Sequence, residues 1–172
     1  VPATGRCPML PFYTEVSVSA LPRTSVSEIV TTHLPLPFRV QQRVRWSDCD
    51  PLGIIWYGSY LKYFEAAEHD MMRASGLPFE TLRLERGVQI PRKAFQVEFH
   101  SPAQMDELLD VECGVAKIGQ TSLTFRFEAY RASDRAHRAS ATLTVVSVVK
   151  ETMQKRPIPD WMREALHPFV IK

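Results

Sequence analysis

Residues 38–76 read FRVQQRVRWSDCDPLGIIWYGSYLKYFEAAEHDMMRASG, and the hydrophobic period changes part-way along this stretch. In the first part, apolar and polar residues alternate, which predicts a β-strand with one face in water. In the second part, apolar residues recur at spacings of three and four, which predicts a helix of about four to five turns. The apolar positions are Phe38, Val40, Val44 and Trp46 in the strand, and Tyr60, Phe64, Ala67, Met71 and Ala74 in the helix. Gly76 and Pro78 predict the end of the helix.

The chain after this helix predicts strands almost throughout. It is rich in Val, Thr and Phe, and the residues alternate in places, as in LTFRFE at 123–128. The expected strands are residues 88–100, 108–116, 122–131 and 139–150, and residues 159–166 fit a short helix. A strand, a long helix and four further strands predict an α+β fold in which one helix covers an antiparallel sheet.

Length and composition predict one folded domain. The chain has 172 residues and is 45% hydrophobic, which suffices for one core. Residues 1–35 contain five prolines and nine serines or threonines without clear periodicity, so we expect a peripheral N-terminal extension there. The expected domain is residues 36–172.

Charge and cysteine content limit the classes of partner and the cellular compartment that we expect. Lys and Arg number 21 against 19 acids, so charge alone predicts no nucleic-acid partner. The cysteines at positions 7, 49 and 113 are far apart and form no metal-type cluster, which favours free thiols in a reducing, cytoplasmic setting. No stretch approaches the ~20 apolar residues that span a bilayer, so we expect no membrane partner.

Two acids, Asp48 and Asp50, stand at the corner between the predicted strand and helix. With Gly53 they match an EF-hand loop in part, but Leu52 and Ser59 stand where that loop needs oxygen ligands, so we expect no calcium site. Acids are also common at turns and helix starts, where they accept backbone hydrogen bonds. From the residues alone, Asp48 is assigned to such a turn, and capping and catalysis are equally open for Asp50.

The run RWSDCDPLGIIWYGSYLKYFE at residues 45–65 resembles the signature of hotdog-fold acyl-CoA thioesterases, in particular the 4-hydroxybenzoyl-CoA thioesterase and YbgC-like group. The shared pattern is an aromatic residue, two acids two positions apart, a glycine, two apolar residues, and a tyrosine that opens a helix carrying a glutamate. The resemblance implies a hotdog fold, with an antiparallel sheet wrapped around one long central helix. It also implies hydrolysis of an acyl-CoA thioester to the free acid and CoA.

The resemblance further implies that Asp50 is the catalytic carboxylate, as nucleophile or as general base toward water. It implies that the backbone N–H near Tyr57 polarises the thioester carbonyl, which suits the unpaired donors of a helix start. Gly53 would let the chain turn tightly. A thiol of pKa ~8.5 leaves without a proton donor, so a carboxylate and an oxyanion hole suffice and a Ser-His-Asp set is not required. No cofactor and no metal are expected. Glu65 has two interpretations, a residue that positions water or plain helix surface.

Several other residues are candidates for binding substrate. Trp56 and Tyr60, with Tyr57, either line an acyl pocket beside Asp50 or pack in the core and an interface. In the resemblance, the loop at residues 117–122 lies where the family contacts the nucleotide part of CoA. The loop residues that can meet phosphates are Lys117, Gln120, Thr121 and Ser122, which equally suit a solvated hairpin turn. The five histidines are scattered along the sequence, so no Ser-His-Asp set is expected.

A hotdog sheet leaves edge strands open, and the family closes them by pairing. The resemblance therefore implies a homodimer or homotetramer with active sites at the dimer interface.

Two other functions stay open on the same fold: a non-catalytic module that binds acyl thioesters, and a dehydratase. The sequence does not decide the acyl group, although aromatic residues near the corner favour an aryl or short acyl chain. It also leaves open whether the carrier is CoA or acyl carrier protein.

Overall fold

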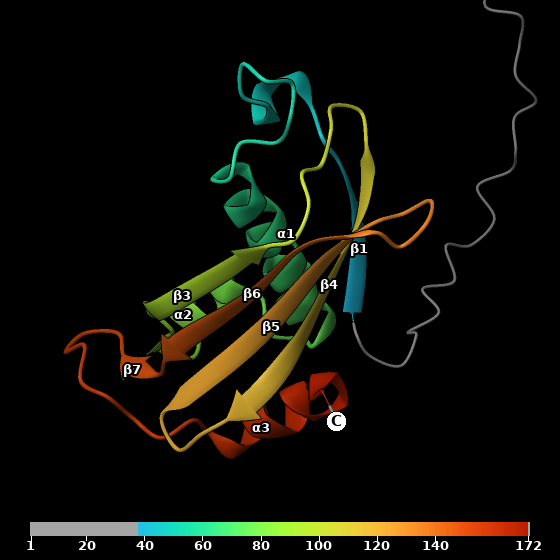
Figure 1. The fold of residues 1–172 in the computed structure, drawn as a ribbon. Helices are drawn as coiled ribbons and strands as arrows, with labels where there is room; N and C mark the ends of the chain where they lie inside the picture. The colour runs from blue at the N-terminus through green and yellow to red at the C-terminus, as the bar shows by residue number, and fades with distance from the viewer. Residues whose placement is uncertain (1–37, 172) are drawn as a thin grey trace, which may run out of the picture. The chain divides into compact units, whose positions relative to one another are not determined.

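The structure is a computed structural model that describes residues 38–171. The predicted extension, residues 1–35, lies outside the described residues. Five antiparallel strands form the main sheet in the order β1-β4-β5-β6-β3 (Figure 1). The bounds are β1 Phe38–Arg43, β3 Arg92–Phe99, β4 Leu108–Ile118, β5 Ser122–Arg131 and β6 His137–Val146. Strands β1 and β3 are therefore the two edges of this sheet.

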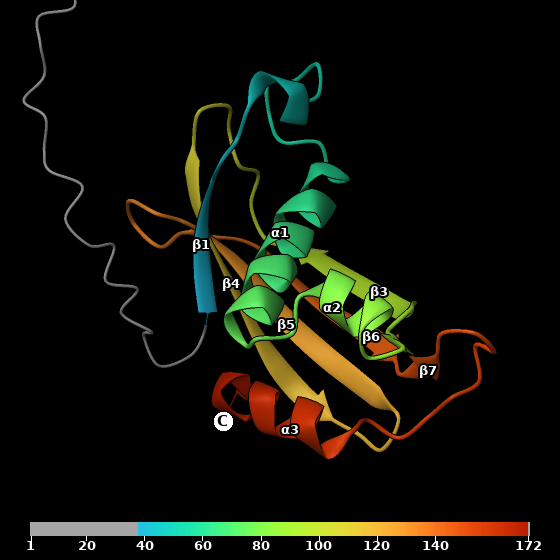
Figure 2. The ribbon, with the colours of Figure 1, turned by 180° about the vertical axis from the view of Figure 1, so that it is seen from behind.

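Helix α1 (Ser59–Ala74) lies across one face of the sheet, as Figure 2 shows from behind. Its apolar side is buried, and the Phe64 ring lies 5.3 Å from the ring of Phe127 on β5. The helix ends at Gly76, whose φ of 75° places it in the left-handed region that favours glycine. The N–H of Leu77 then donates to the carbonyl of Met72 at 2.8 Å, which closes the last turn. The predicted helix and its end are confirmed.

Smaller elements complete the fold. A second sheet pairs β2 (Val88–Gln89) with β7 (Val148–Val149). Two short helices, α2 and α3, span Phe79–Leu84 and Asp160–Leu166, and single 3-10 turns, η1 and η2, span Trp46–Asp48 and His167–Phe169. Helix α3 confirms the predicted C-terminal helix. The expected α+β class, with an antiparallel sheet and one long helix, is also confirmed.

Three local predictions were wrong. The strand expected at residues 88–100 is broken before β3, because Pro91 has no N–H to donate to a strand ladder. The strand expected at 139–150 is broken at Ser147, whose N–H donates to the carbonyl of Thr121 at 2.8 Å. Trp46 is 81% exposed, because β1 ends at Arg43 and a 3-10 turn begins at Trp46.

Among residues 38–171, no helix is long and apolar enough to cross a membrane. Helix α2 was not predicted: its six residues are too few to establish a helical period in the sequence.

Candidate active site

The corner between β1 and α1 is closed by backbone hydrogen bonds. The N–H of Asp50 donates to the carbonyl of Ile54 at 2.9 Å, and the N–H of Gly53 donates to the carbonyl of Asp50 at 3.0 Å. Gly53 has a φ of 76°, so this turn uses the conformation that glycine adopts without steric cost. The N–H of Ile55 donates to the carbonyl of Ala103 at 2.8 Å and ties the corner to the segment before β4.

Asp48 is buried in this corner, and its hydrogen-bonding capacity is used by the fold. Its carboxylate accepts from the Arg45 N–H at 2.8 Å, and also from the Tyr63 hydroxyl and the Lys62 ammonium. Burial by itself would raise the pKa of Asp48, but these hydrogen bonds outweigh it and lower the pKa below its usual value. Its carbonyl accepts from the Ser59 hydroxyl at 3.0 Å and so fixes the start of α1. These contacts agree with a structural role for Asp48.

Asp50 has a different environment from Asp48. It is half-buried, and one carboxylate oxygen accepts the Leu52 N–H at 2.8 Å. The other carboxylate oxygen has no hydrogen-bond partner among the described residues. Asp50 also lines a cavity of about 440 Å³. Its carboxylate is therefore held by the turn at one oxygen and is available to a ligand at the other.

This cavity gathers three of the residues that the sequence singled out. They are Asp50, Tyr57 and Tyr60, and the remaining lining comes from Ile54, Ile55, Phe99, His100, Ser101 and Pro102. Tyr60 is 2% exposed, and its ring lies 5.7 Å from that of Phe99 and 6.0 Å from that of Phe64. Burial raises the pKa of Tyr60 to about 12, and its hydroxyl oxygen has no partner among the described residues. The cavity wall is thus largely aromatic, with a few polar groups.

The residues just before α1 have unpaired backbone donors, and one of these residues, Tyr57, lines the cavity of Asp50. Within residues 38–171, the N–H groups of Tyr57 and Gly58 donate to no acceptor, and no side chain caps the helix. Unpaired donors at a helix start, with the positive end of the helix dipole, suit a developing negative charge. Trp56 does not line the cavity. It is 49% exposed, and its ring lies 4.8 Å from that of Tyr57.

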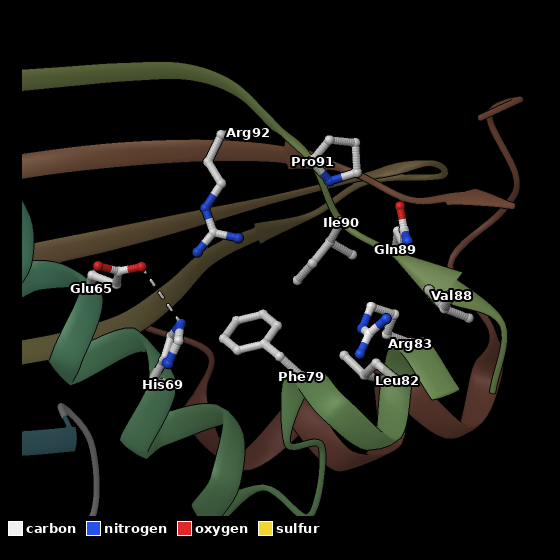
Figure 3. Close-up of a pocket in the computed structure, with 10 residues that line it drawn as sticks. All are labelled: Glu65, His69, Phe79, Leu82, Arg83, Val88, Gln89, Ile90, Pro91 and Arg92. Atoms are coloured by element: carbon white, nitrogen blue, oxygen red, sulfur yellow. Dashed lines mark ion pairs between the residues drawn. The ribbon is translucent and has the colours of Figure 1, made fainter. Parts of the chain in front are cut away.

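Glu65 lies outside the cavity of Asp50. It is exposed, and its carboxylate lies 3.8 Å from His69 Nε2. Figure 3 shows Glu65, His69, Phe79 and Arg92 around a second cavity, of about 320 Å³. The structure therefore separates Glu65 from Asp50, although both belong to the same sequence signature.

The predicted CoA loop also lies away from Asp50 within one chain. Strand β4 begins at Leu108, opposite Arg43 beside the corner, and it ends at Ile118 next to the loop. Ten extended residues at ~3.3 Å each put the loop about 30 Å from the corner. Figure 1 shows the turn between β4 and β5 near α3, at the opposite end of the sheet from the corner. The Arg163 guanidinium donates to the carbonyl of Gly119 in this loop at 2.6 Å.

Glu68 is a buried acid that was not predicted as a site residue. It is 1% exposed, and one carboxylate oxygen accepts from the Arg92 guanidinium at 2.8 Å. The other oxygen has no partner among the described residues. Burial raises the pKa of Glu68 to about 7, against the opposing charge of Arg92. The sequence signal was its place on the apolar side of the helix, four residues after Phe64.

Two histidines that are far apart in sequence meet beside the cavity. The His100 and His137 rings stack at 3.9 Å between centroids, and His137 Nε2 lies 2.8 Å from a carboxylate oxygen of Glu128. His100 Nε2 lies 3.0 Å from the Ser140 hydroxyl. Although the histidines are scattered along the sequence, strand pairing brings β6 beside the end of β3 and so places these two rings together.

The corner thus offers a carboxylate and free N–H donors at one cavity, which is a set suited to attack on a carbonyl group. The family model described as the thioesterase-like superfamily matches residues 44–166, most of the chain. The chain belongs to this superfamily.

Known proteins of the superfamily are similar to this chain over most of its described part. The acyl-CoA thioester hydrolase YbgC of Escherichia coli O6:H1 is 30% identical over 122 residues, which are 71% of this chain and 90% of the relative. The 4-hydroxybenzoyl-CoA thioesterase of Pseudomonas sp. is 31% identical over 94 residues, which are 54% of this chain and 67% of the relative. A solved 1,4-dihydroxy-2-naphthoyl-CoA thioesterase from Synechocystis has a TM-score of 0.71 at 18% identity, with 76% of this chain and 96% of that chain covered.

These similarities confirm the predicted hotdog fold and the predicted class of enzyme, a thioester hydrolase of the thioesterase-like superfamily. They do not test which residues are catalytic or which thioester is hydrolysed, so those assignments stay predictions. No group of three or more His, Cys, Asp or Glu residues that could hold a metal ion occurs in the part of the chain that the structure describes.

Proposed function

We propose that this chain hydrolyses an aryl- or short-acyl-CoA thioester to the free acid and CoA, with Asp50 as the catalytic carboxylate. The observation that carries the proposal is the cavity at the corner, where Asp50 and the start of α1 meet. The relatives named as acyl-CoA thioester hydrolase and 4-hydroxybenzoyl-CoA thioesterase support the substrate class.

In the proposed reaction, the carbonyl oxygen of the thioester accepts hydrogen bonds from the free N–H groups of Tyr57 and Gly58. These donors stabilise the negative charge that develops on the oxygen when the carbonyl is attacked. Asp50 either attacks the carbonyl carbon directly or takes a proton from the water that does. The Leu52 N–H, which donates to Asp50 at 2.8 Å, holds the carboxylate in place for either role. The thioester carbon–sulfur bond then breaks, and sulfur keeps the electron pair. Attack by water gives the free acid directly, whereas attack by Asp50 leaves an acyl-aspartyl anhydride, which a water molecule then hydrolyses to the free acid.

The walls of the cavity support the proposed acyl preference. Tyr57, Tyr60 and Phe99 supply aromatic surface, and Ile54 and Ile55 supply aliphatic surface. A cavity of about 440 Å³ lies in the range of small-molecule sites. An aryl or short acyl group would pack its faces or edges against these rings. Trp56 would contribute at the entrance, because it is half exposed and packs against Tyr57.

A second copy of the chain would complete the site. Strand β3 is an edge of the sheet with eight mostly exposed residues, and such an edge favours pairing with another strand. Exposed apolar side chains gather at the corner, on α1 and on β3, and they include Trp56, Leu61 and Phe99. We therefore propose a homodimer or homotetramer.

The dimer would account for the predicted residues that lie away from Asp50. Because the loop at 117–122 lies about 30 Å along β4 from its own corner, its CoA contacts would be made to a substrate bound at the partner's Asp50 or at the mouth between subunits. Lys117, Gln120, Thr121 and Ser122 would then meet the nucleotide phosphates. Glu65 would act from the interface as a positioning group for water.

The proposed function is tested with a panel of thioesters on the purified native chain. The panel holds benzoyl, hydroxybenzoyl, short-chain and long-chain acyl-CoA, and release of the free thiol is followed by its reaction with a disulfide reagent. We expect kcat/KM to be highest for aryl or short acyl groups, because these fit the aromatic cavity. Hydrolysis of none of these thioesters would refute the proposal. A clear preference for long chains would refute the acyl assignment alone.

A further inference from the structure

His100 stands on the wall of the cavity that holds Asp50, directly after the last residue of β3. It reaches the cavity from the sheet, whereas Asp50 and Tyr57 reach it from the corner and the start of α1. His100 is also the residue of the cavity lining that can carry a positive charge. An imidazole beside a carboxylate in one cavity is a combination that acid–base chemistry uses often.

The His100 ring is held in place although it is exposed. Its Nε2 lies 3.0 Å from the Ser140 hydroxyl, and its face stacks on His137 at 3.9 Å. His137 is in turn held by Glu128 at 2.8 Å and stacks on Tyr130 at 4.7 Å. Ordering an exposed side chain costs conformational entropy, so these contacts with residues of β5 and β6 are more than a surface residue requires.

The contact with Ser140 uses only one of the two ring nitrogens of His100. A neutral imidazole has one N–H and one acceptor nitrogen. When the Ser140 hydroxyl donates to Nε2, the ring proton lies on Nδ1, which has no hydrogen-bond partner among the described residues. His100 then offers an N–H to a ligand.

In the proposed reaction, no residue of the corner stabilises the departing sulfur. Asp50 is the nucleophile or activates the attacking water, and the N–H groups of Tyr57 and Gly58 donate hydrogen bonds to the carbonyl oxygen. Neither contacts the sulfur, which takes the electron pair of the carbon–sulfur bond as that bond breaks. We infer that His100 is a further catalytic residue, whose ring N–H donates a hydrogen bond to the departing sulfur of the thioester.

In this step the carbon–sulfur bond breaks, the sulfur receives its electron pair, and the His100 N–H stabilises the resulting thiolate. Water then protonates the thiolate, so His100 needs no separate proton source. The inference rests on the proposed function, because it assumes a thioester in the cavity. A hydrogen bond to a charged group would change the rate by about 10- to 100-fold.

The test compares two thioesters that share one acyl group and differ in the thiol. One is the acyl-CoA. The other is the thioester of the same acyl group with an aromatic thiol (called the aryl thioester below), which is more acidic than the thiol of CoA and leaves more easily without help. The variant His100→Gln keeps a polar side chain but loses the ring. We expect kcat to fall by about 10- to 100-fold on the acyl-CoA and by less than about threefold on the aryl thioester. His167→Gln makes the same change at an exposed position near the C-terminus and should lose activity on neither ester.

Circular dichroism and the melting temperature check that His100→Gln is folded. An equal loss on both esters, or no loss on the acyl-CoA, overturns the role of His100 at the sulfur. These outcomes require turnover by the wild type. If the wild type hydrolyses neither ester, the proposed function itself fails and the inference falls with it, which is a distinguishable result.

Discussion

Burial of the Glu68 carboxyl makes the stability of the fold depend on pH. Glu68 is 1% exposed, and only one of its oxygens is hydrogen-bonded, to Arg92. Its pKa rises from an ordinary 4.5 to about 7 on folding. Between these values the folded chain keeps a proton that the unfolded chain has released. The free energy of unfolding therefore falls as the pH rises through this range and stays lower above pH 7.

The magnitude follows from the difference between the two pKa values. One pKa unit corresponds to ~1.4 kcal/mol, so the full effect is about 3 kcal/mol, and most of it falls between pH 5 and pH 8. The variant Glu68→Gln does not titrate but still offers an acceptor to Arg92. We therefore expect Glu68→Gln to gain stability relative to the wild type by about 2–3 kcal/mol as the pH rises from 5 to 8.

Urea unfolding at several pH values measures this difference, because titrating groups shared by both proteins cancel in it. Glu65→Gln is the matched control. It makes the same chemical change on the same helix at an exposed position, so its difference from the wild type should stay within about 0.5 kcal/mol. If the difference in unfolding free energy between Glu68→Gln and the wild type did not change with pH, the account of the burial of Glu68 would be refuted. A difference of the opposite sign would mean that the charged pair with Arg92 stabilises the fold.

Three further predictions concern the corner and the assembly. Asp48→Asn should destabilise the fold by about 2 kcal/mol in urea unfolding, because it removes the charge that Lys62 and Tyr63 contact in a buried position, and an unchanged midpoint would contradict this. Gly53→Ala should cost about 1 kcal/mol, seen as a melting temperature lower by about 2–4 °C, because only the positive φ opposes the new methyl group; an equal or higher melting temperature would argue against strain. Light scattering at micromolar concentration should give the mass of a dimer or tetramer, and a monomer would rule out a site completed by a second copy.

Much of the fold could be predicted because its long elements have unambiguous periods. The apolar residues of α1 recur regularly over 16 residues, and the strand predicted at 122–131 is β5 with the same bounds. The predictions failed where a tertiary contact or one residue decided the outcome. Pro91 splits a stretch that is otherwise typical of a strand, and the two-residue strand before it, β2, finds its partner β7 only in the folded chain.

The candidate site could likewise be predicted only in part. Asp50, Tyr57 and Tyr60 come from one continuous stretch, so a single motif brings them to one cavity. His100 and His137 are 37 positions apart, and only the pairing of β3 with β6 brings them together. The environment of Glu68, on α1, depends on Arg92 from strand β3. A sequence shows which residues can do chemistry, but their neighbours across a sheet depend on its strand order.

The most direct test of the central claim is the kcat of Asp50→Asn on the preferred acyl-CoA of the wild type. The substitution keeps the shape of the side chain and removes its charge and basicity. Asp70→Asn, at an exposed position on α1, is the matched control. We expect Asp50→Asn to lose at least about a hundredfold in kcat with an unchanged fold and oligomeric state, and Asp70→Asn to retain the wild-type kcat. Retention of turnover by Asp50→Asn would contradict the assignment of Asp50 as the catalytic carboxylate.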